Sequence, residues 1–390
     1  MRRLTGLSFI IAGLMAAAPA QAQSKRQLDL CNNVGNKSTP EQMVSNCAAF
    51  IQGKTRGAQL GPFYVNRGIG YFGLQQYDKA MADFERALDL IPKNPIPYLQ
   101  RANVWLARGQ PEKALADLNR SIELNPKYVY AWYNRGNVYF QMGQYEKADE
   151  DFTAAIKIDP KLPTIYANRA NVRTQLKRYD AAIEDATTSL ALMPKGTGPA
   201  VRAISLGNRA VAYGMKKEFD RAVADLNEAI KLAPRAGLYN ARAYALSKSG
   251  HLDLALKDAE EMIRLDAKDA GAWNLKCWYR GLIGSELDGA LADCNKSIEL
   301  APTSANAFDS RGLVYLKLKQ YDKAVADYNT ALKAAGYVEG GPVGAPLANN
   351  LYGRGVGRLR SGDPLGGAGD MAAAKAVKPE VVDDYKEYGI

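Results

Sequence analysis

The chain has 390 residues, of which 47% are hydrophobic and 24% are charged, and its formal net charge is +10. This composition excludes a chain that is disordered throughout, because such chains are poor in hydrophobic residues and carry a high net charge for their length. The positive charge is modest and forms no long basic run, so we expect no nucleic-acid partner. The single histidine, His251, argues against metal sites and nucleophile–base pairs, most of which use histidine, while carboxylate-based chemistry stays open. We expect no metal site and no cofactor.

The first two dozen residues have the pattern of an export signal. Arg2 and Arg3 precede an apolar stretch over residues 4–18, and residues 20–22 (Ala-Gln-Ala) form a small-x-small cleavage site. We therefore expect a signal peptide over residues 1–22 and a periplasmic location, with secretion as the alternative. An uncleaved membrane anchor is the other interpretation, but the apolar stretch is short for spanning a bilayer. After cleavage we expect no stable membrane insertion.

From residue 61 onward the sequence repeats itself with a period of 34 residues. The segment 61–94 aligns without a gap with the segment 129–162, and an insertion over residues 197–202 interrupts the frame once. Repeats of this length indicate a stack of small units and not a compact globule. We predict repeats one to four over 61–196, repeats five to eight over 203–335, a Gly/Pro loop over 336–347, a Gly-rich ninth repeat over 348–379 and a C-terminal cap over 380–390.

The same positions of each repeat carry the same kind of side chain. Counted from the first residue of a repeat, position 4 is large, position 8 is small, position 20 is alanine in the first eight repeats, and position 32 is mostly proline. Positions 4, 8 and 11 lie on one face of a helix, as do positions 20, 24 and 27 on a second helix, which the proline ends. Each repeat is therefore predicted to be a hairpin of two antiparallel helices that buries its apolar face by stacking on its neighbours.

This pattern resembles the tetratricopeptide repeat (TPR) family over about residues 24–379. The resemblance implies an all-α fold, a right-handed superhelical solenoid of antiparallel helix pairs. It also implies a concave groove that holds a peptide or a segment of a partner protein.

Two charged positions recur inside the repeat. Position 7 is arginine in eight repeats, where the family usually has leucine, and position 23 is aspartate in all nine. Both positions flank the buried faces, where a charge must be paired, so we predict structural ion pairs and not an active row of charges. Whether each pair closes within a repeat or across to the next stays open. The first four sets are Arg67 with Asp83, Arg101 with Asp117, Arg135 with Asp151, and Arg169 with Asp185.

An even number of cysteines in an exported chain predicts disulfides. Cys277 and Cys294 occupy positions 8 and 24 of one repeat, and Cys31 and Cys47 have a spacing that matches the same positions. Residues 24–57 are therefore interpreted as a degenerate N-terminal hairpin. Positions 8 and 24 face each other across a hairpin, so we predict the bridges Cys31–Cys47 and Cys277–Cys294, with buried free thiols as the alternative.

Several positions that face the groove in the family carry asparagine here. An asparagine amide offers both donors and an acceptor, which match a peptide backbone. The row is similar to the asparagine ladder in the repeats of the eukaryotic O-GlcNAc transferase, whereas the lysine at position 5 of the carboxylate clamp of Hsp70/Hsp90 co-chaperones is missing. The alternative is that these amides bond to neighbouring helices without a ligand. The predicted peptide-binding groove consists of Asn66, Asn103, Tyr133, Asn134, Asn137, Asn168, Asn171 and Asn208.

The leading hypothesis for function is a scaffold or adaptor that binds a protein or an extended peptide in its groove. A regulatory subunit of an envelope enzyme complex and a self-associating structural element are the alternatives. The repeats leave no room for a catalytic domain, so we expect no enzyme activity. The ninth repeat is expected to be the least stable, because each glycine in a helix costs up to about 1 kcal/mol relative to alanine.

Overall fold

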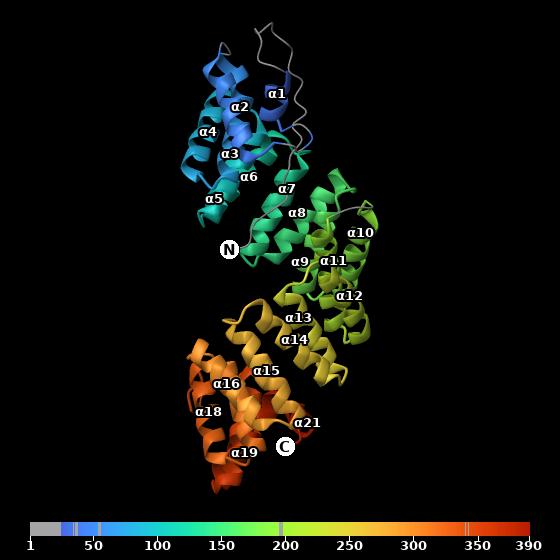
Figure 1. Ribbon diagram of the computed structural model, residues 1–390, viewed down its shortest axis with the longest axis vertical. Helices are drawn as coiled ribbons and strands as arrows, with labels where there is room; N and C mark the ends of the chain where they lie inside the picture. Colours follow the sequence, from blue (N-terminus) through green and yellow to red (C-terminus); the bar gives the residue numbers. More distant parts are fainter. Residues whose placement is uncertain are drawn as a thin grey trace. The chain divides into compact units, whose positions relative to one another are not determined.

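The computed structural model describes residues 25–33, 35, 38–53, 56–194, 198–339, 341 and 343–390. The leader predicted over residues 1–22 lies outside this part of the chain. The described residues form helices and short 3-10 turns without a β-strand, and consecutive helices pack in pairs (Figure 1). The chain divides into two compact units, one up to Leu192 and one from Met193, and each unit is considered by itself.

The first unit contains five helix pairs among its described residues, each with a first and a second helix joined by a short turn. Thr39 caps the second helix of the first pair, because its side chain accepts a hydrogen bond from the backbone of Gln42 while the Gln42 side chain accepts one from the backbone of Thr39. The elements are α1 (Lys25–Cys31), α2 (Pro40–Gln52), η2 (Gly57–Leu60), α3 (Gly61–Gly73), α4 (Tyr77–Leu90), α5 (Pro95–Ala107), α6 (Pro111–Leu124), α7 (Val129–Gln141), α8 (Tyr145–Ile158), α9 (Pro163–Gln175) and α10 (Tyr179–Leu192).

The second unit contains five further pairs and a final short helix among its described residues. Its elements are α11 (Pro199–Met215), α12 (Phe219–Leu232), α13 (Ala236–Lys248), α14 (Leu252–Leu265), α15 (Ala270–Ile283), α16 (Leu287–Leu300), α17 (Ala305–Lys317), α18 (Tyr321–Ala334), η3 (Ala345–Leu347), α19 (Ala348–Ser361), α20 (Pro364–Val377) and α21 (Val381–Glu387).

The fifth repeat begins earlier than the sequence predicts. Part of the insertion before Ala203 is helical, because α11 begins at Pro199. Proline is well suited to a first helical position, where its missing N–H would have no partner within the helix. The added turn brings Arg202 to Glu228 on α12, with 2.9 Å between Arg202 Nε and Glu228 Oε1.

The small residue at position 8 of a repeat packs against position 24 of the same hairpin. A Cβ atom on Gly68 would lie 2.5 Å from the ring of Phe84, and one on Gly136 would lie 2.8 Å from the ring of Phe152. Both rings are completely buried. Glycine is therefore required opposite an aromatic ring, because even a methyl group would overlap with it.

Two hairpins join these positions with a disulfide. Cys31 is bonded to Cys47 with a Cα–Cα distance of 4.9 Å, and Cys277 is bonded to Cys294 with a Cα–Cα distance of 5.2 Å. All four side chains are buried. The two bridges are consistent with the pairing that the spacing predicts.

The glycines of the ninth repeat lie where helices approach one another closely. A Cβ atom on Gly355 would lie 2.8 Å from the carbonyl oxygen of Gly367, and one on Gly357 would lie 2.8 Å from the side chain of Val325. Both α19 and α20 are regular helices in spite of these glycines. The low stability of the ninth repeat, expected from helix propensity, stays a prediction. Close packing between helices explains why glycine stands at these two positions.

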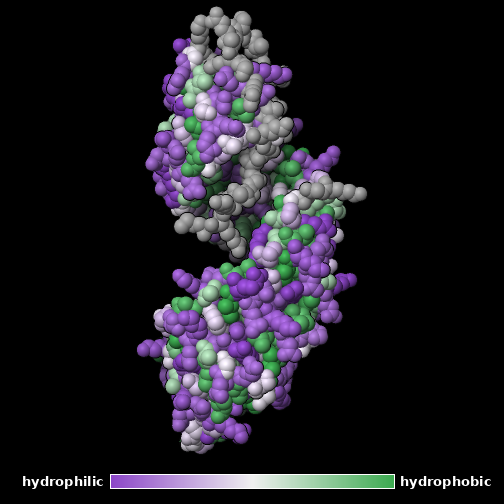
Figure 2. Space-filling model, in the orientation of Figure 1, coloured by the Kyte–Doolittle hydropathy of each residue, from purple (hydrophilic) through white to green (hydrophobic). Residues whose placement is uncertain are grey.

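The surface is polar on the side that Figure 2 shows. In each unit, hydrophobic residues form small separate patches there among hydrophilic ones. Within the described ranges, no helix combines the length and the apolar character needed to cross a bilayer.

The turn inside each of the nine repeats has a left-handed residue at position 15. Glycine adopts this conformation without steric cost. In other residues the close contact between Cβ and the following carbonyl oxygen costs conformational free energy. The glycines are Gly109, Gly143, Gly250, Gly284 and Gly362, and the other residues, with φ between 57° and 62°, are Gln75, Lys177, Lys217 and Lys319.

We predict that Lys177→Gly stabilises the protein by about 0.5–1 kcal/mol, because it removes the strain of a left-handed residue with a side chain. The measurement is the midpoint of urea denaturation, followed by circular dichroism. Lys161→Gly is the control, since Lys161 is another exposed turn lysine but has no positive φ. Equal midpoints for Lys177→Gly and the parent chain would contradict the assignment of strain to this turn.

Candidate functional site

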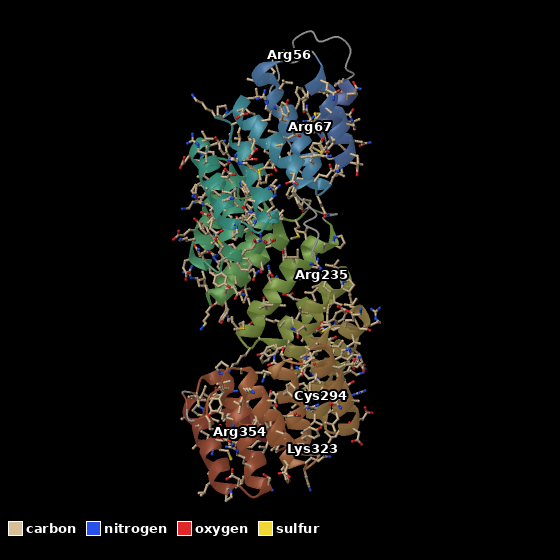
Figure 3. The ribbon with its side chains drawn as sticks, turned by 90° about the vertical axis from the view of Figure 1, so that its left-hand side faces the viewer. Arg56, Arg67, Arg235, Cys294, Lys323 and Arg354 are labelled. Carbon is tan, nitrogen blue, oxygen red and sulfur yellow. A yellow bond between two sulfur atoms is a disulfide. The ribbon has the colours of Figure 1, made fainter. Side chains whose placement is uncertain are left out.

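In eight of the repeats, one arginine binds an aspartate of the same hairpin through two parallel hydrogen bonds. In the third repeat, Arg135 Nε and Nη2 donate to Oδ2 and Oδ1 of Asp151 at 2.8 and 2.7 Å. Each pair therefore closes within its own hairpin. We call this set the Arg–Asp ladder; Arg67 and Arg354 are labelled in Figure 3. Its pairs are Arg67–Asp83, Arg101–Asp117, Arg135–Asp151, Arg169–Asp185, Arg209–Asp225, Arg242–Asp258, Arg311–Asp327 and Arg354–Asp370.

The remaining guanidinium nitrogen of several ladder arginines reaches the preceding hairpin. Arg135 Nη1 donates to Asn119 Oδ1 at 2.7 Å, and Arg169 Nη1 donates to Thr153 Oγ1 at 3.0 Å. Asn227, Asn295 and Asn329 accept the corresponding bonds from Arg242, Arg311 and Arg354. One side chain thus closes its own hairpin and also ties it to its neighbour.

Aromatic rings lie on the ladder guanidinium groups. The Cζ atom of Arg135 lies 4.9 Å from the ring centroid of Trp132 at position 4 and 5.8 Å from that of Tyr139 at position 11. Such cation–π contacts contribute about 0.5–1 kcal/mol each. The hydrogen bonds to Asp151 raise the pKa of Arg135 above its ordinary value, so this arginine stays charged at every working pH.

The seventh repeat has a different arrangement, because its position 7 is Lys276. Lys276 Nζ lies 3.9 Å from Asp293, and Arg280 takes over the close contact at 2.7 Å. Arg280 stands one helical turn after Lys276, at position 11, and Arg173 and Arg358 stand at the same position of their repeats. The sequence analysis missed these arginines, although their recurrence at one position was a readable signal.

The amides predicted to line a groove lie mostly on the first helices of the first unit. Here we define the amide row, which includes one residue that the sequence analysis missed, Gln100 at position 6. At position 6, Asn66, Gln100 and Asn134 are buried, whereas Asn168 and the residues at position 9 are half-buried. The amide row consists of Asn66 on α3, Gln100 and Asn103 on α5, Asn134 and Asn137 on α7, and Asn168 and Asn171 on α9.

Several amides of the row bond to neighbouring hairpins. Asn168 Nδ2 donates to Asn137 Oδ1 at 2.8 Å and to the hydroxyl of Tyr133 at 3.1 Å. Asn66 Nδ2 donates to Asn32 Oδ1 at 2.9 Å. The amide row thus contributes to the contact between repeats, as the alternative interpretation of these asparagines expected.

Two buried amide donors of the row have no hydrogen-bond partner among the described residues. They are Gln100 Nε2 and Asn134 Nδ2, on the neighbouring repeats α5 and α7. Leaving a buried donor without a partner costs about 1–3 kcal/mol. Asn208, the last predicted groove residue, lies on α11 in the second unit and is not part of the amide row.

We predict that Asp151→Ala destabilises the protein by about 3 kcal/mol, because it leaves the largely buried Arg135 without its carboxylate. The exposed pair of Arg86 and Asp89 supplies the control, with side chains that are 55% and 68% exposed. Asp89→Ala should cost under about 0.5 kcal/mol. Urea denaturation measures both changes, and equal losses would contradict a structural role for the ladder.

Comparisons with known proteins identify the repeats. The family described as Tetratricopeptide repeat matches residues 62–94, 129–162, 203–235 and 305–336, and the family described as TPR repeat matches residues 102–143. These segments cover hairpins in both units.

The chain is also similar to curated proteins and to a solved structure. It is 34% identical to the Hsp70-Hsp90 organizing protein of Triticum aestivum over 79 residues, and 35% identical to the Hsp70-Hsp90 organizing protein 1 of Glycine max over 79 residues. Each match covers 20% of this chain but only 13% and 14% of those two proteins.

The solved structure is that of the APC/C hetero-tetramer Cut9-Hcn1. It is similar with a TM-score of 0.56 at 16% identity, and the match covers 75% of this chain and 56% of that one. At this identity the similarity supports the fold alone. The chain therefore contains tetratricopeptide repeats, an all-helical fold that serves as a scaffold for protein–protein interaction.

Proposed function

We propose that the protein is a periplasmic scaffold that holds a partner protein or an extended peptide on the amide row of its first unit. The predicted export signal supports this location. The two disulfides support it as well, since disulfides persist in oxidising compartments such as the periplasm.

The observation that carries the proposal is that hydrogen bonds between amides at positions 6 and 9 fix the orientation of the amide at position 9. Asn168 donates to Asn137 Oδ1 and the Asn137 amide also bonds to the Tyr133 hydroxyl, which leaves one amide donor of Asn137 for a ligand. Asn103 donates through its Nδ2 to Gln100 Oε1 at 3.3 Å, which leaves the carbonyl oxygen of Asn103 as an acceptor. Half-buried amides whose orientation is fixed in this way match the alternating donors and acceptors of a peptide backbone.

Recognition of this kind reads the backbone of a partner more than its side chains. It therefore suits a scaffold that accepts segments of different sequence in an extended form. A regulatory subunit of an enzyme complex and a self-associating element are the alternative outcomes of the test below.

We predict that replacing Asn103 and Asn137 together by alanine weakens partner capture about thirtyfold, because two hydrogen bonds of about 1 kcal/mol each are lost. The tagged chain is incubated with a periplasmic extract, and the captured proteins are quantified by mass spectrometry. Circular dichroism checks that the helix content is unchanged.

Asn46→Ala is the matched control, because the Asn46 amide bonds to the backbone of its own helix, α2. It should capture the same proteins as the parent chain. Undiminished capture by the double variant would contradict the amide-row proposal, and recovery of only a second copy of the chain would favour self-association.

A further inference from the structure

One face of the first helices in repeats one to four carries no charge. Residues three or four apart share a face of a helix, so positions 2, 5, 6, 9, 12 and 13 of a repeat lie on one side, the side of the amide row. On α3, α5, α7 and α9, all of which the structure describes, these positions hold no Asp, Glu, Lys or Arg, although 24% of the residues of the chain are charged. We call this surface the neutral face; beside the amide row it includes Leu106, Ala107, Tyr130, Phe140, Gln141 and Gln175.

The repeat fold does not require uncharged residues at these positions. In the second unit the same positions include Lys248 on α13 and Asp309 and Lys317 on α17. Both helices pack against the second helix of their hairpin as the other first helices do. Neutrality over four successive repeats is therefore not imposed by helix packing.

The charges that the four helices do carry lie on their other side and are paired. They are four ladder arginines, at position 7, and Arg173, at position 11, and both positions lie opposite position 9 around the helix. Each ladder arginine binds the aspartate of its own hairpin. Arg173 Nε lies 3.0 Å from Asp149 Oδ1, and Arg173 Nη1 lies 2.9 Å from Asp185 Oδ2. No side chain of these helices therefore offers an opposite charge to a ligand on the neutral face.

A ligand on the neutral face meets amides and aromatic rings that are held in place. Asn137 accepts a hydrogen bond from Asn168 at 2.8 Å, and Phe140 packs against Tyr145 with ring centroids 5.7 Å apart. A charged side chain placed here loses part of its hydration and gains no opposite charge, which is unfavourable. An uncharged side chain bears no such cost, so the neutral face selects its ligand by excluding charge.

We propose that the partner segment bound on the amide row is an extended stretch of polypeptide without charged side chains. The amides of Asn103 and Asn137 bind its backbone, and the neutral face admits apolar, hydroxyl and amide side chains beside them. This inference rests on the proposed function, because both concern the same surface. It adds a selection by charge, which backbone recognition alone does not give.

The test uses the full chain with the photoreactive residue p-benzoylphenylalanine in place of Gln141. This position is exposed and lies one helical turn after Asn137 on α7. After irradiation in a periplasmic extract, the adducts are digested with chymotrypsin, which does not cleave at charged residues, and the crosslinked peptides are sequenced by mass spectrometry. Charged residues should be about threefold rarer beside the crosslink than in other chymotryptic peptides of the same proteins.

The matched control carries the same photoreactive residue in place of Glu150, which is exposed on α8, the second helix of the same hairpin. Its adducts should show no depletion of charged residues. A further variant combines the crosslinker at Gln141 with Gln175→Glu, which places a carboxylate at position 13 of the next repeat. Lysine and arginine should then return beside the crosslink, because the neutral face now offers them an opposite charge.

The outcomes separate this inference from the proposed function. If charged residues are as frequent beside the Gln141 crosslink as elsewhere, the selection by charge is overturned while capture on the amide row stands. No more adducts from Gln141 than from Glu150 would contradict the amide row itself and, with it, this inference. Adducts of the Gln175→Glu variant that stay free of lysine and arginine would show that charge does not govern the choice of segment, and would overturn the inference as well.

Discussion

The bidentate pair of arginine and aspartate inside each hairpin is the constraint on which the other features depend. A ladder arginine such as Arg135 makes bonds in three directions, to Asp151 on its own second helix, to Asn119 on the preceding hairpin, and to the rings beside it. A largely buried guanidinium tolerates little displacement, because a misplaced charge loses its hydrogen bonds while it stays desolvated. The ladder thus fixes the rotation of each first helix and, with it, the direction of the adjacent positions 6 and 9.

The two units use their first helices in different ways. In the first unit these helices present amides that hold one another in fixed orientations, such as Asn168 and Asn137. In the second unit, Trp278 on α15 and Tyr352 on α19 pack against the rings of Tyr388 and Tyr385 at the C-terminal end of the chain. One repeated scaffold therefore carries amides on the first helices of one unit and aromatic rings on first helices of the other, because the ladder leaves these positions free to vary.

The features that depend on the repeat period could be predicted from the sequence, and those that depend on local distances could not. The period indicates the bridge between Cys31 and Cys47, and it indicates that the recurring arginines and aspartates pair. That Arg67 binds Asp83 of its own hairpin, and not an aspartate of the next, required the structure. The bond from Arg135 to Asn119 depends on how closely two hairpins stack, which the period does not specify. The positive φ of Lys177 could not be predicted for another reason. Among the turn residues, only glycine indicates a left-handed conformation by its residue type.

A double-mutant cycle between Asn119 and Arg135 tests most directly whether the ladder ties neighbouring hairpins together. The two single alanine variants and the double variant are compared by urea denaturation with the parent chain. The account predicts a coupling energy of about 1 kcal/mol, as expected for a hydrogen bond to a charged group at a partly exposed site. A coupling energy of zero within error would show that the arginine stabilises only its own hairpin and would contradict the account.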